Sequence, residues 1–155
     1  MQRERKPADE VSPCNGTAMR KASRRLTQLY DDALAPCGLR STQYAILAEL
    51  NRLAKEPPTM AGLASALVMD RSALGHNLRP LERDGFIELQ ESDEDRRRRY
   101  VVMTSKGKAK FQAAKRFWQA AQNRFNEVLG ESEAEDLRAR LLAIAYDERL
   151  AVVKD

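Results

Sequence analysis

Four consecutive arginines, Arg96 to Arg99, are the residues of this chain best suited to bind a charged partner. They end a polar, charged stretch that starts at Ser92, and short segments of alternating apolar side chains flank that stretch. Alternation with a period of two is typical of strands, so the pattern predicts a hairpin with the arginines at its tip. Because a guanidinium group binds phosphate through parallel hydrogen bonds, the tip is a candidate contact for a nucleic-acid backbone. A solvated surface loop is the competing interpretation.

The helix predicted just before the hairpin supplies a second group of candidate residues. Its apolar side chains fall within about 60° of one another and are expected to face the core: Leu74, Leu78 and Leu81. Its opposite face carries hydrogen-bond donors and no acidic residue: Ser72, His76, Arg79 and Arg83. Such a face can read base edges in a major groove, and Ala73 can touch a thymine methyl group. A cap within Asp70 to Ser72 and the turn residue Gly85 bound this helix.

The rest of the sequence supplies the elements that must position these groups. Caps, apolar spacing and breakers predict further helices. They lie over about 17–34, after Ser41 or Thr42, after Thr59, from Thr104 or Ser105 to about Leu129, and after Ser132, with Glu135 completing a capping box. Three helices followed by a hairpin are typical of a winged helix-turn-helix, here over about residues 41–104. The N-termini near Thr42 and Thr59 are expected to offer backbone N–H groups to phosphates.

The predicted fold class is therefore mainly α with a small β-hairpin wing, joined to a helical dimerisation region. Helices over about 17–34 and 105–153 carry more apolar surface than one small winged core can cover, which favours a homodimer. We expect residues 14–155 to form a single unit and residues 1–13 to form a flexible basic N-terminal arm.

Charge is unevenly distributed along the 155 residues, whose net charge is only +4. Residues 96–116 contain nine basic side chains and no acidic one, which indicates a local anionic partner. No apolar run approaches the roughly 20 residues needed to span a bilayer, and the N-terminus has no apolar core typical of a signal peptide. We therefore expect a cytoplasmic protein with no membrane partner.

Residues for catalysis or metal binding are scarce. Two cysteines, Cys14 and Cys37, and one histidine, His76, do not make a zinc site, and neither a metal nor another cofactor is expected. The sequence has no glycine-rich phosphate loop and no nucleophile elbow, so we do not expect an enzyme. A thiol-dependent enzyme would need a base near Cys14, and a winged helix that contacts only protein is a further alternative.

Several short motifs also carry a family resemblance. They are the segments Gly38 to Leu47 and Leu81 to Ile87, and the spacing of Asp95, Arg97, Thr104 and Gly107. Over about residues 17–150 the chain resembles MarR-type winged helix-turn-helix transcriptional regulators. The resemblance implies a homodimer that binds a pseudo-palindromic operator in double-stranded DNA, and we expect a repressor. It also implies that Arg97 is the wing arginine and Asp95 its orienting carboxylate, whereas His76 stands where a longer basic side chain is common.

The candidate DNA-binding residues, from the pattern and the resemblance together, are Thr42, Thr59, Ser72, Ala73, His76, Arg79, Arg83, Asp95, Arg96, Arg97 and Arg98.

The sequence is compatible with two mechanisms of switching. In the first, a small, often aromatic effector binds between the dimer helices and the winged core, with Tyr30, Tyr44 and Trp118 as candidate lining residues. In the second, an oxidant modifies Cys14, which lies just before a helix N-terminus with Arg20 one to two turns away, an environment that favours thiolate. A DNA-binding protein without either switch is the third alternative.

Overall fold

The computed structural model describes residues 12–151 of the chain. The predicted basic arm, residues 1–13, therefore lies outside the described residues except for Ser12 and Pro13. The described part is mostly helical, with one antiparallel two-stranded hairpin, and this confirms the predicted fold class. None of its helices is long and apolar enough to cross a membrane.

The elements follow the order expected of a winged helix with helices on either side. They are α1 (Asn15–Leu34), the short helix η2 (Ala35–Cys37), α2 (Ser41–Arg52), α3 (Met60–Ala66), α4 (Arg71–Arg83), β1 (Ile87–Glu91), β2 (Arg99–Met103), α5 (Ser105–Leu129), α6 (Glu131–Ala145) and the short helix η3 (Glu148–Leu150). The strands pair in register from Ile87 with Met103 to Glu91 with Arg99, so the wing tip spans residues 92–98.

Three predicted caps are confirmed, because each side chain accepts a hydrogen bond from a backbone N–H in the first helical turn. Thr59 caps α3 through the Gly62 N–H at 3.1 Å, and Asp70 caps α4 through the Ala73 N–H at 2.7 Å. Thr104 caps α5, with its Oγ1 3.0 Å from the Gly107 nitrogen. These caps satisfy donors that a helix start otherwise leaves unpaired.

Two predicted helix starts were wrong. Cys14, rather than Asn15 or Thr17, caps α1, with its Sγ accepting the Thr17 N–H at 3.4 Å. The predicted capping box of Ser132 does not form, because α6 already starts at Glu131 and has no side-chain cap. Gly130, with φ of +101°, turns the chain directly from α5 into α6, a conformation open to glycine and strained for other residues.

The core lies where the helix-turn-helix, the hairpin and α5 meet. Leu74 and Leu81 of α4 are fully buried there, as the helical spacing predicts, together with Ile46 and Leu47 of α2. Other core residues come from every neighbouring element: Leu34, Leu63, Ile87, Val101, Phe111 and Ala114. The outward face of α4 is therefore fixed by the burial of its inward face.

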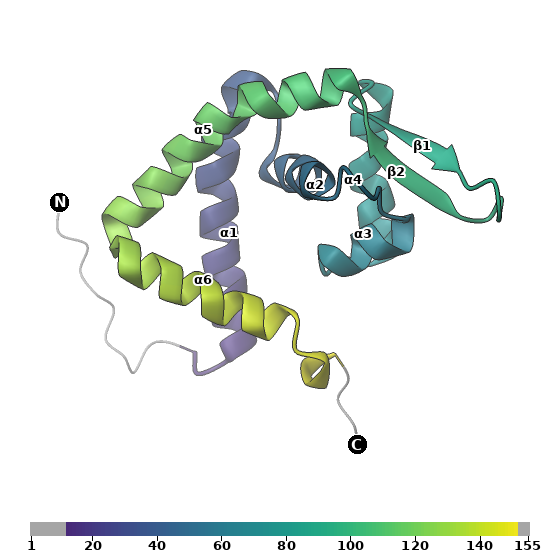
Figure 1. The fold of residues 1–155 in the computed structure, drawn as a ribbon. Coiled ribbons are helices and arrows are strands. Elements are labelled where there is room, and N and C mark those ends of the chain that lie inside the picture. Colours follow the sequence, from purple (N-terminus) through teal and green to yellow (C-terminus); the bar gives the residue numbers. More distant parts are fainter. Residues whose placement is uncertain (1–11, 152–155) are drawn as a thin grey trace.

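Helix α5 connects the winged helix with α1 and α6, and these three helices are called the outer helices below. Its N-terminal end follows the wing, and its C-terminal end lies at the far corner of the molecule, where the chain turns back into α6 (Figure 1). Helix α6 then crosses α1 and returns toward α3, whose last residue, Ala66, lies near the end of α6 (Figure 1).

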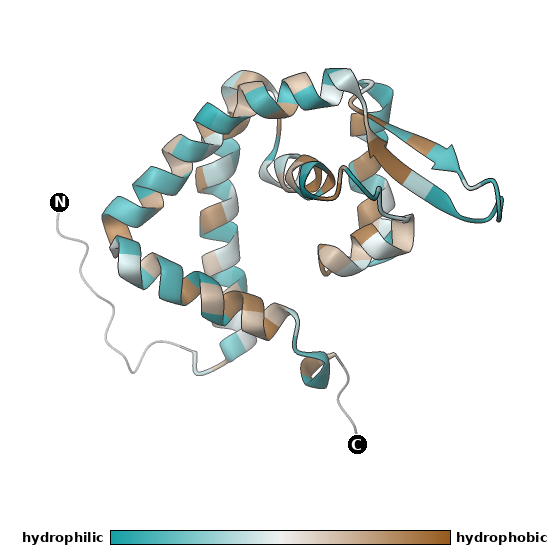
Figure 2. Cartoon of the chain, viewed as in Figure 1, coloured by the Kyte–Doolittle hydropathy of each residue, from teal (hydrophilic) through white to brown (hydrophobic). Residues whose placement is uncertain are grey.

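Helix α6 contains several hydrophobic residues, drawn as brown segments in Figure 2, and some of their side chains are exposed. Leu142 and Ile144 are 49% and 44% exposed, and Val128 at the end of α5 is 70% exposed. Leu137 and Leu141 extend the same surface. A surface of this kind is typical of a site that another molecule covers.

Candidate nucleic-acid interface

The outward face of α4 presents donor side chains to solvent. Ser72, His76, Arg79 and Arg83 are exposed and Ala73 is half-buried. Among the described residues, His76 and Arg79 form no side-chain hydrogen bond or ion pair, so their donors are free to bind a ligand. Arg83 differs, since its Nε lies 3.0 Å from the Asp84 carboxylate. That hydrogen bond is the main reason that the pKa of Asp84 is lowered.

The wing tip is folded by its own short side chains. The Ser92 Oγ accepts the N–H groups of Glu94 and Asp95, and the Ser92 N–H donates to the carbonyl of Arg98. The Asp95 carboxylate accepts the backbone N–H of Arg97 at 2.9 Å. Asp95 therefore orients the backbone of Arg97, and among the described residues no ion pair joins the two side chains. The guanidinium groups of the wing stay exposed for an external anion.

A groove of about 610 Å³ lies between the wing and the start of α3, and it is called the wing groove below. Its lining contains cations from two elements: Arg71, Arg97, Arg98 and Arg99, with Thr59, Met60 and Ala61. The Val101 N–H donates to the Pro58 carbonyl at 2.9 Å, which holds the wing against α3. Four guanidinium groups around an open groove form a surface suited to phosphates.

The predicted residues divide according to whether they reach this groove. Thr59, Arg97 and Arg98 line it, whereas Arg96 and Thr42 do not. At the start of α2, the carboxylate of Asp31 already accepts the Ser41 N–H at 2.6 Å, which leaves less room for a phosphate near Thr42. Arg71 was not among the predicted residues, although a basic residue directly after a helix cap is a recognisable signal.

The three aromatic residues considered for an effector site are not grouped in one place. Tyr30 lines a cavity of about 270 Å³ between the outer helices, and its hydroxyl donates to Gln122 Oε1 at 2.5 Å. Burial raises the pKa of Tyr30, and the charge of Arg138 acts against that rise. Arg138 was not predicted, because it lies far from Tyr30 in the sequence and only the fold brings the two residues to one cavity.

Tyr44 and Trp118 lie in the core instead. Their rings stack with centroids 5.8 Å apart and planes 15° apart, and the ring of Phe111 lies 5.3 Å from Tyr44. Burial raises the pKa of the Tyr44 hydroxyl. Tyr44 and Trp118 therefore pack between α2 and α5, and they do not line the cavity between α1, α5 and α6.

The two cysteines stand at opposite ends of α1. Cys14 is exposed, and hydrogen bonds from Thr17, first from its side chain and then from its backbone, lower the pKa of the thiol. Cys37 is half-buried and its thiol donates to the Leu34 carbonyl. Because a helix of 20 residues is about 30 Å long, the two thiols of one chain are too far apart to form a disulfide.

Comparisons with known proteins agree with this geometry. Residues 38–98 match the sequence model of the MarR family. A search of curated protein sequences found no match. Among solved structures, the chain is similar to the Mycobacterium tuberculosis transcriptional regulator MosR in complex with DNA, with 28% identity and a TM-score of 0.79. That match covers 90% of this chain and 99% of the other.

The transcriptional repressor CouR is similar in two states. CouR bound to a 23-mer DNA duplex is 26% identical, with a TM-score of 0.78 and coverage of 92% of this chain and 99% of the other. CouR from Rhodococcus jostii RHA1 bound to p-coumaroyl-CoA is 22% identical, with a TM-score of 0.74 and coverage of 92% and 96%. The wing, the donor face of α4 and these matches agree: residues 38–98 match the MarR family, and the chain as a whole has the fold of MarR-type DNA-binding transcriptional regulators.

Proposed function

We propose that two copies of this chain bind a pseudo-palindromic DNA duplex and act as a transcriptional repressor. The observation that carries the proposal is the wing groove, where Arg71 and three wing arginines surround the start of α3. In a winged helix bound to DNA, α4 would enter the major groove while the wing follows the backbone or the adjacent minor groove. The exposed face of α4 then meets base edges, and the wing groove meets phosphates.

The second copy is proposed from the apolar surface of α6. Leu137, Leu141 and Leu142 are each at least 37% exposed on a helix that crosses α1. An isologous dimer covers such a surface on both copies at once, and it repeats the recognition helix with two-fold symmetry. A duplex with two half-sites about 34 Å apart fits that arrangement.

The direct test is a titration of labelled duplex DNA with wild-type protein and the Arg97→Ala variant over a range of salt concentrations. Arg97→Ala is expected to weaken binding on all sequences and to lower the salt slope by about one per protomer, because one phosphate contact is lost. Arg140→Ala, which removes an exposed arginine of α6, serves as the control. Equal slopes for Arg97→Ala and wild type would contradict the placement of the wing on DNA.

We further propose that the effector is a small aromatic acid held in the cavity between α1, α5 and α6. The partner copy would close this cavity, because Leu137, Leu141 and Leu142 belong both to its walls and to the proposed dimer surface. The apolar walls of the cavity suit an aromatic ring, and the cation Arg138 suits a carboxylate. The hydrogen-bonded pair Tyr30 and Gln122 lines the same cavity. CouR, which has the same fold, is known in a structure bound to p-coumaroyl-CoA. Because α1 and α5 lead into the winged helix, a ligand that separates the outer helices would alter the distance between the two α4 helices.

A panel of aromatic carboxylates added to the protein–DNA complex tests this second point. An effector is expected to release DNA from wild type, and Arg138→Gln is expected to need a higher concentration of it. The alcohol that matches each acid separates the carboxylate contact from apolar binding. Release of DNA by acid and alcohol alike, in both proteins, would remove Arg138 from the proposed site.

One observation favours a redox switch as the alternative. Cys14 is exposed at the N-terminus of α1, and its pKa is lowered, so the nucleophilic thiolate is present at lower pH than in an ordinary cysteine. Peroxide would oxidise this thiolate to a sulfenic acid, with the peroxide reduced to water. A gel shift with peroxide on wild type and Cys14→Ser decides the matter. If both proteins release DNA equally, Cys14 is not the sensor.

A further inference from the structure

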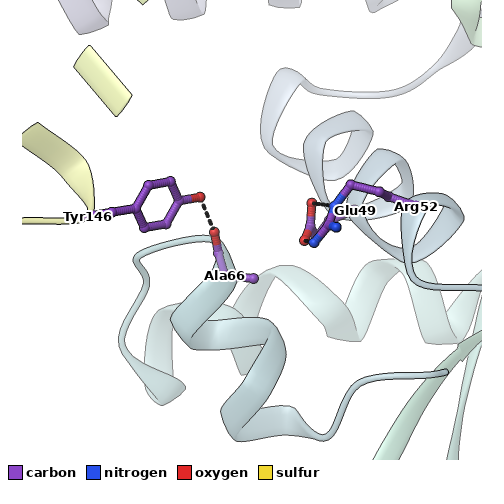
Figure 3. A network of polar contacts seen from close by, with 4 residues as sticks. All are labelled: Glu49, Arg52, Ala66 and Tyr146. Carbon is purple, nitrogen blue, oxygen red and sulfur yellow. Dashed lines mark hydrogen bonds and ion pairs between the residues drawn. The ribbon is translucent and has the colours of Figure 1, made fainter. Parts of the chain in front are cut away.

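A single polar contact joins the end of α6 to the helix-turn-helix. Tyr146, the residue that follows α6, donates its hydroxyl to the backbone carbonyl of Ala66 at 2.7 Å, across 80 residues of sequence (Figure 3). Ala66 is the last residue of α3. Within residues 12–151, no other hydrogen bond or ion pair connects the segment from 131 onward with the winged helix.

The Tyr146 hydroxyl is the protein donor that reaches the Ala66 carbonyl, at a contact that is exposed to solvent. The neighbouring carbonyls at the end of α3 accept backbone N–H groups, since Met69 donates to Ala64 at 2.9 Å and Val68 donates to Ser65 at 3.1 Å. Among the described residues, Ala66 receives no backbone donor, and Tyr146 supplies its hydrogen bond. The last carbonyls of a helix need such outside donors, so Tyr146 acts as a cap provided by a distant element.

The turn that follows is strained and lightly packed. Val68 has φ of +52° and is the one non-glycine residue with positive φ in the described part of the chain. A β-branched residue adopts this conformation at a cost, and such strain persists only when the surroundings hold it. A cleft of about 860 Å³, lined by Val68, Met69, Ile144 and Leu150 among others, lies between the turn and the C-terminal segment. The Tyr146 hydrogen bond therefore bridges two segments that pack little against each other.

The two ends of α4 are held in different ways. At the C-terminal end, α5 holds the chain directly, because Lys106 Nζ donates to the Asp84 carbonyl at 2.7 Å and Thr104 Oγ1 donates to the Gly85 carbonyl at 2.6 Å. The N-terminal end, at Asp70, follows the strained turn. Among the described residues, the bond from Tyr146 to Ala66 is the one hydrogen bond that connects the C-terminal segment with the chain just before this turn.

We propose that Tyr146 is a positioning residue for DNA recognition, which fixes the N-terminal end of α4 relative to the outer helices. The inference rests on the proposed function, since it concerns two recognition helices in one dimer. With both ends held, the separation of the two α4 helices matches one distance between half-sites. Without the Tyr146 hydroxyl, the winged helix can pivot as a unit, with α4 in it, about its attachment to α5, and the dimer accepts a wider range of distances.

The experiment compares wild type with Tyr146→Phe on duplexes built from the sequence that wild type selects from random DNA. In one series the distance between half-sites is unchanged, and in the others it is one or two base pairs shorter or longer. Tyr146→Phe is expected to lose affinity at the selected distance by no more than about twelve-fold, since the value of one neutral hydrogen bond is the upper limit. It is also expected to discriminate less between the distances. A purely structural role of the hydroxyl would not flatten that profile.

Arg52→Gln is the matched control. It breaks the ion pair of Arg52 with Glu49, 2.6 Å long, which lies wholly within α2 and is drawn beside Tyr146 in Figure 3. Arg52→Gln is expected to keep the wild-type profile. Thermal melting of all three proteins accompanies the binding data.

The outcomes separate the two proposals. If wild type binds DNA with a sharp preference for one distance and Tyr146→Phe has the same profile, the positioning role is overturned while the proposed function stands. A lower melting temperature of Tyr146→Phe with an unchanged profile overturns it as well. If wild type binds no duplex, the proposed function fails and this inference fails with it.

Discussion

Arg79 and Arg97 are both exposed cations, but their elements give them different tasks. Arg79 lies on the outward face of α4, one turn from His76, where a major groove would present base edges. Arg97 lies on the wing, where its backbone is oriented by Asp95 and its side chain lines the wing groove. One residue is therefore placed to read sequence and the other to hold the backbone.

Arg79→Ala is expected to relax base preference by about 1–3 kcal/mol at one position of each half-site, because one guanidinium-to-base contact is lost. The measurement is a comparison of affinities on the selected sequence and on single-base variants of it. Arg97→Ala should weaken binding to all these duplexes alike. Equal losses for Arg79→Ala on selected and random DNA would contradict base reading by this residue.

At the same scale, Thr17 is expected to control the reactivity of Cys14. Its side chain makes the largest contribution to lowering the pKa of the Cys14 thiol, so Thr17→Val should raise that pKa toward the ordinary value. The alkylation rate, which follows the thiolate, should then rise at higher pH than in wild type. Iodoacetamide kinetics against pH in a Cys37→Ser background measure the shift. Thr17→Ser keeps a hydroxyl and should behave as wild type, and a midpoint unchanged in Thr17→Val would disprove the assignment.

Helix α5 is held against the start of the wing by a close approach at Gly107. A Cβ atom there would lie 2.0 Å from the Phe86 carbonyl oxygen and 2.8 Å from Met103 Cγ. A hydrogen bond joins the same two segments, because the Thr104 N–H donates to the Phe86 carbonyl at 3.0 Å. A side chain at Gly107 would therefore force α5 and the hairpin apart.

Gly107→Ala is expected to lower the free energy of unfolding by about 3 kcal/mol, the upper range for overpacking. Gly75→Ala is the matched control, because it lies within α4 and its Cβ would meet no atom within 4 Å. That variant should stabilise the free protein by about 0.5–1 kcal/mol, since alanine favours the helix. Urea unfolding of both variants gives the values, and comparable stability of the two would refute the close approach.

Elements with a strong local signal were predictable from the sequence. The caps Thr59, Asp70 and Thr104 and the leucine stripe of α4 are encoded within one or two turns, and the structure confirms them. The start of α6 was wrong because the backbone of Gly130 sets it, while Ser132 offered a plausible cap. Contacts between segments far apart in the sequence, such as Tyr146 with Ala66 or Tyr30 with Gln122, leave no local pattern. They could be identified only from the folded structure.

The proposed assembly depends on a second copy that covers the apolar face of α6. Leu142→Glu is expected to prevent association, because a charge would be buried in the proposed dimer interface. The mass in solution by light scattering should fall from that of two chains to that of one. Arg140→Glu changes a neighbouring exposed residue of the same helix and should remain dimeric. A wild-type protein that is monomeric at all concentrations would refute the interface.

The mass of the complex between wild-type protein and the selected duplex, measured by light scattering after size-exclusion chromatography, shows how many copies bind one duplex. We expect two chains on each duplex that contains both half-sites. Scrambling one half-site should weaken binding strongly, since both recognition helices act on one duplex. A single chain bound to the duplex, or no complex in dilute salt, would contradict the proposed function.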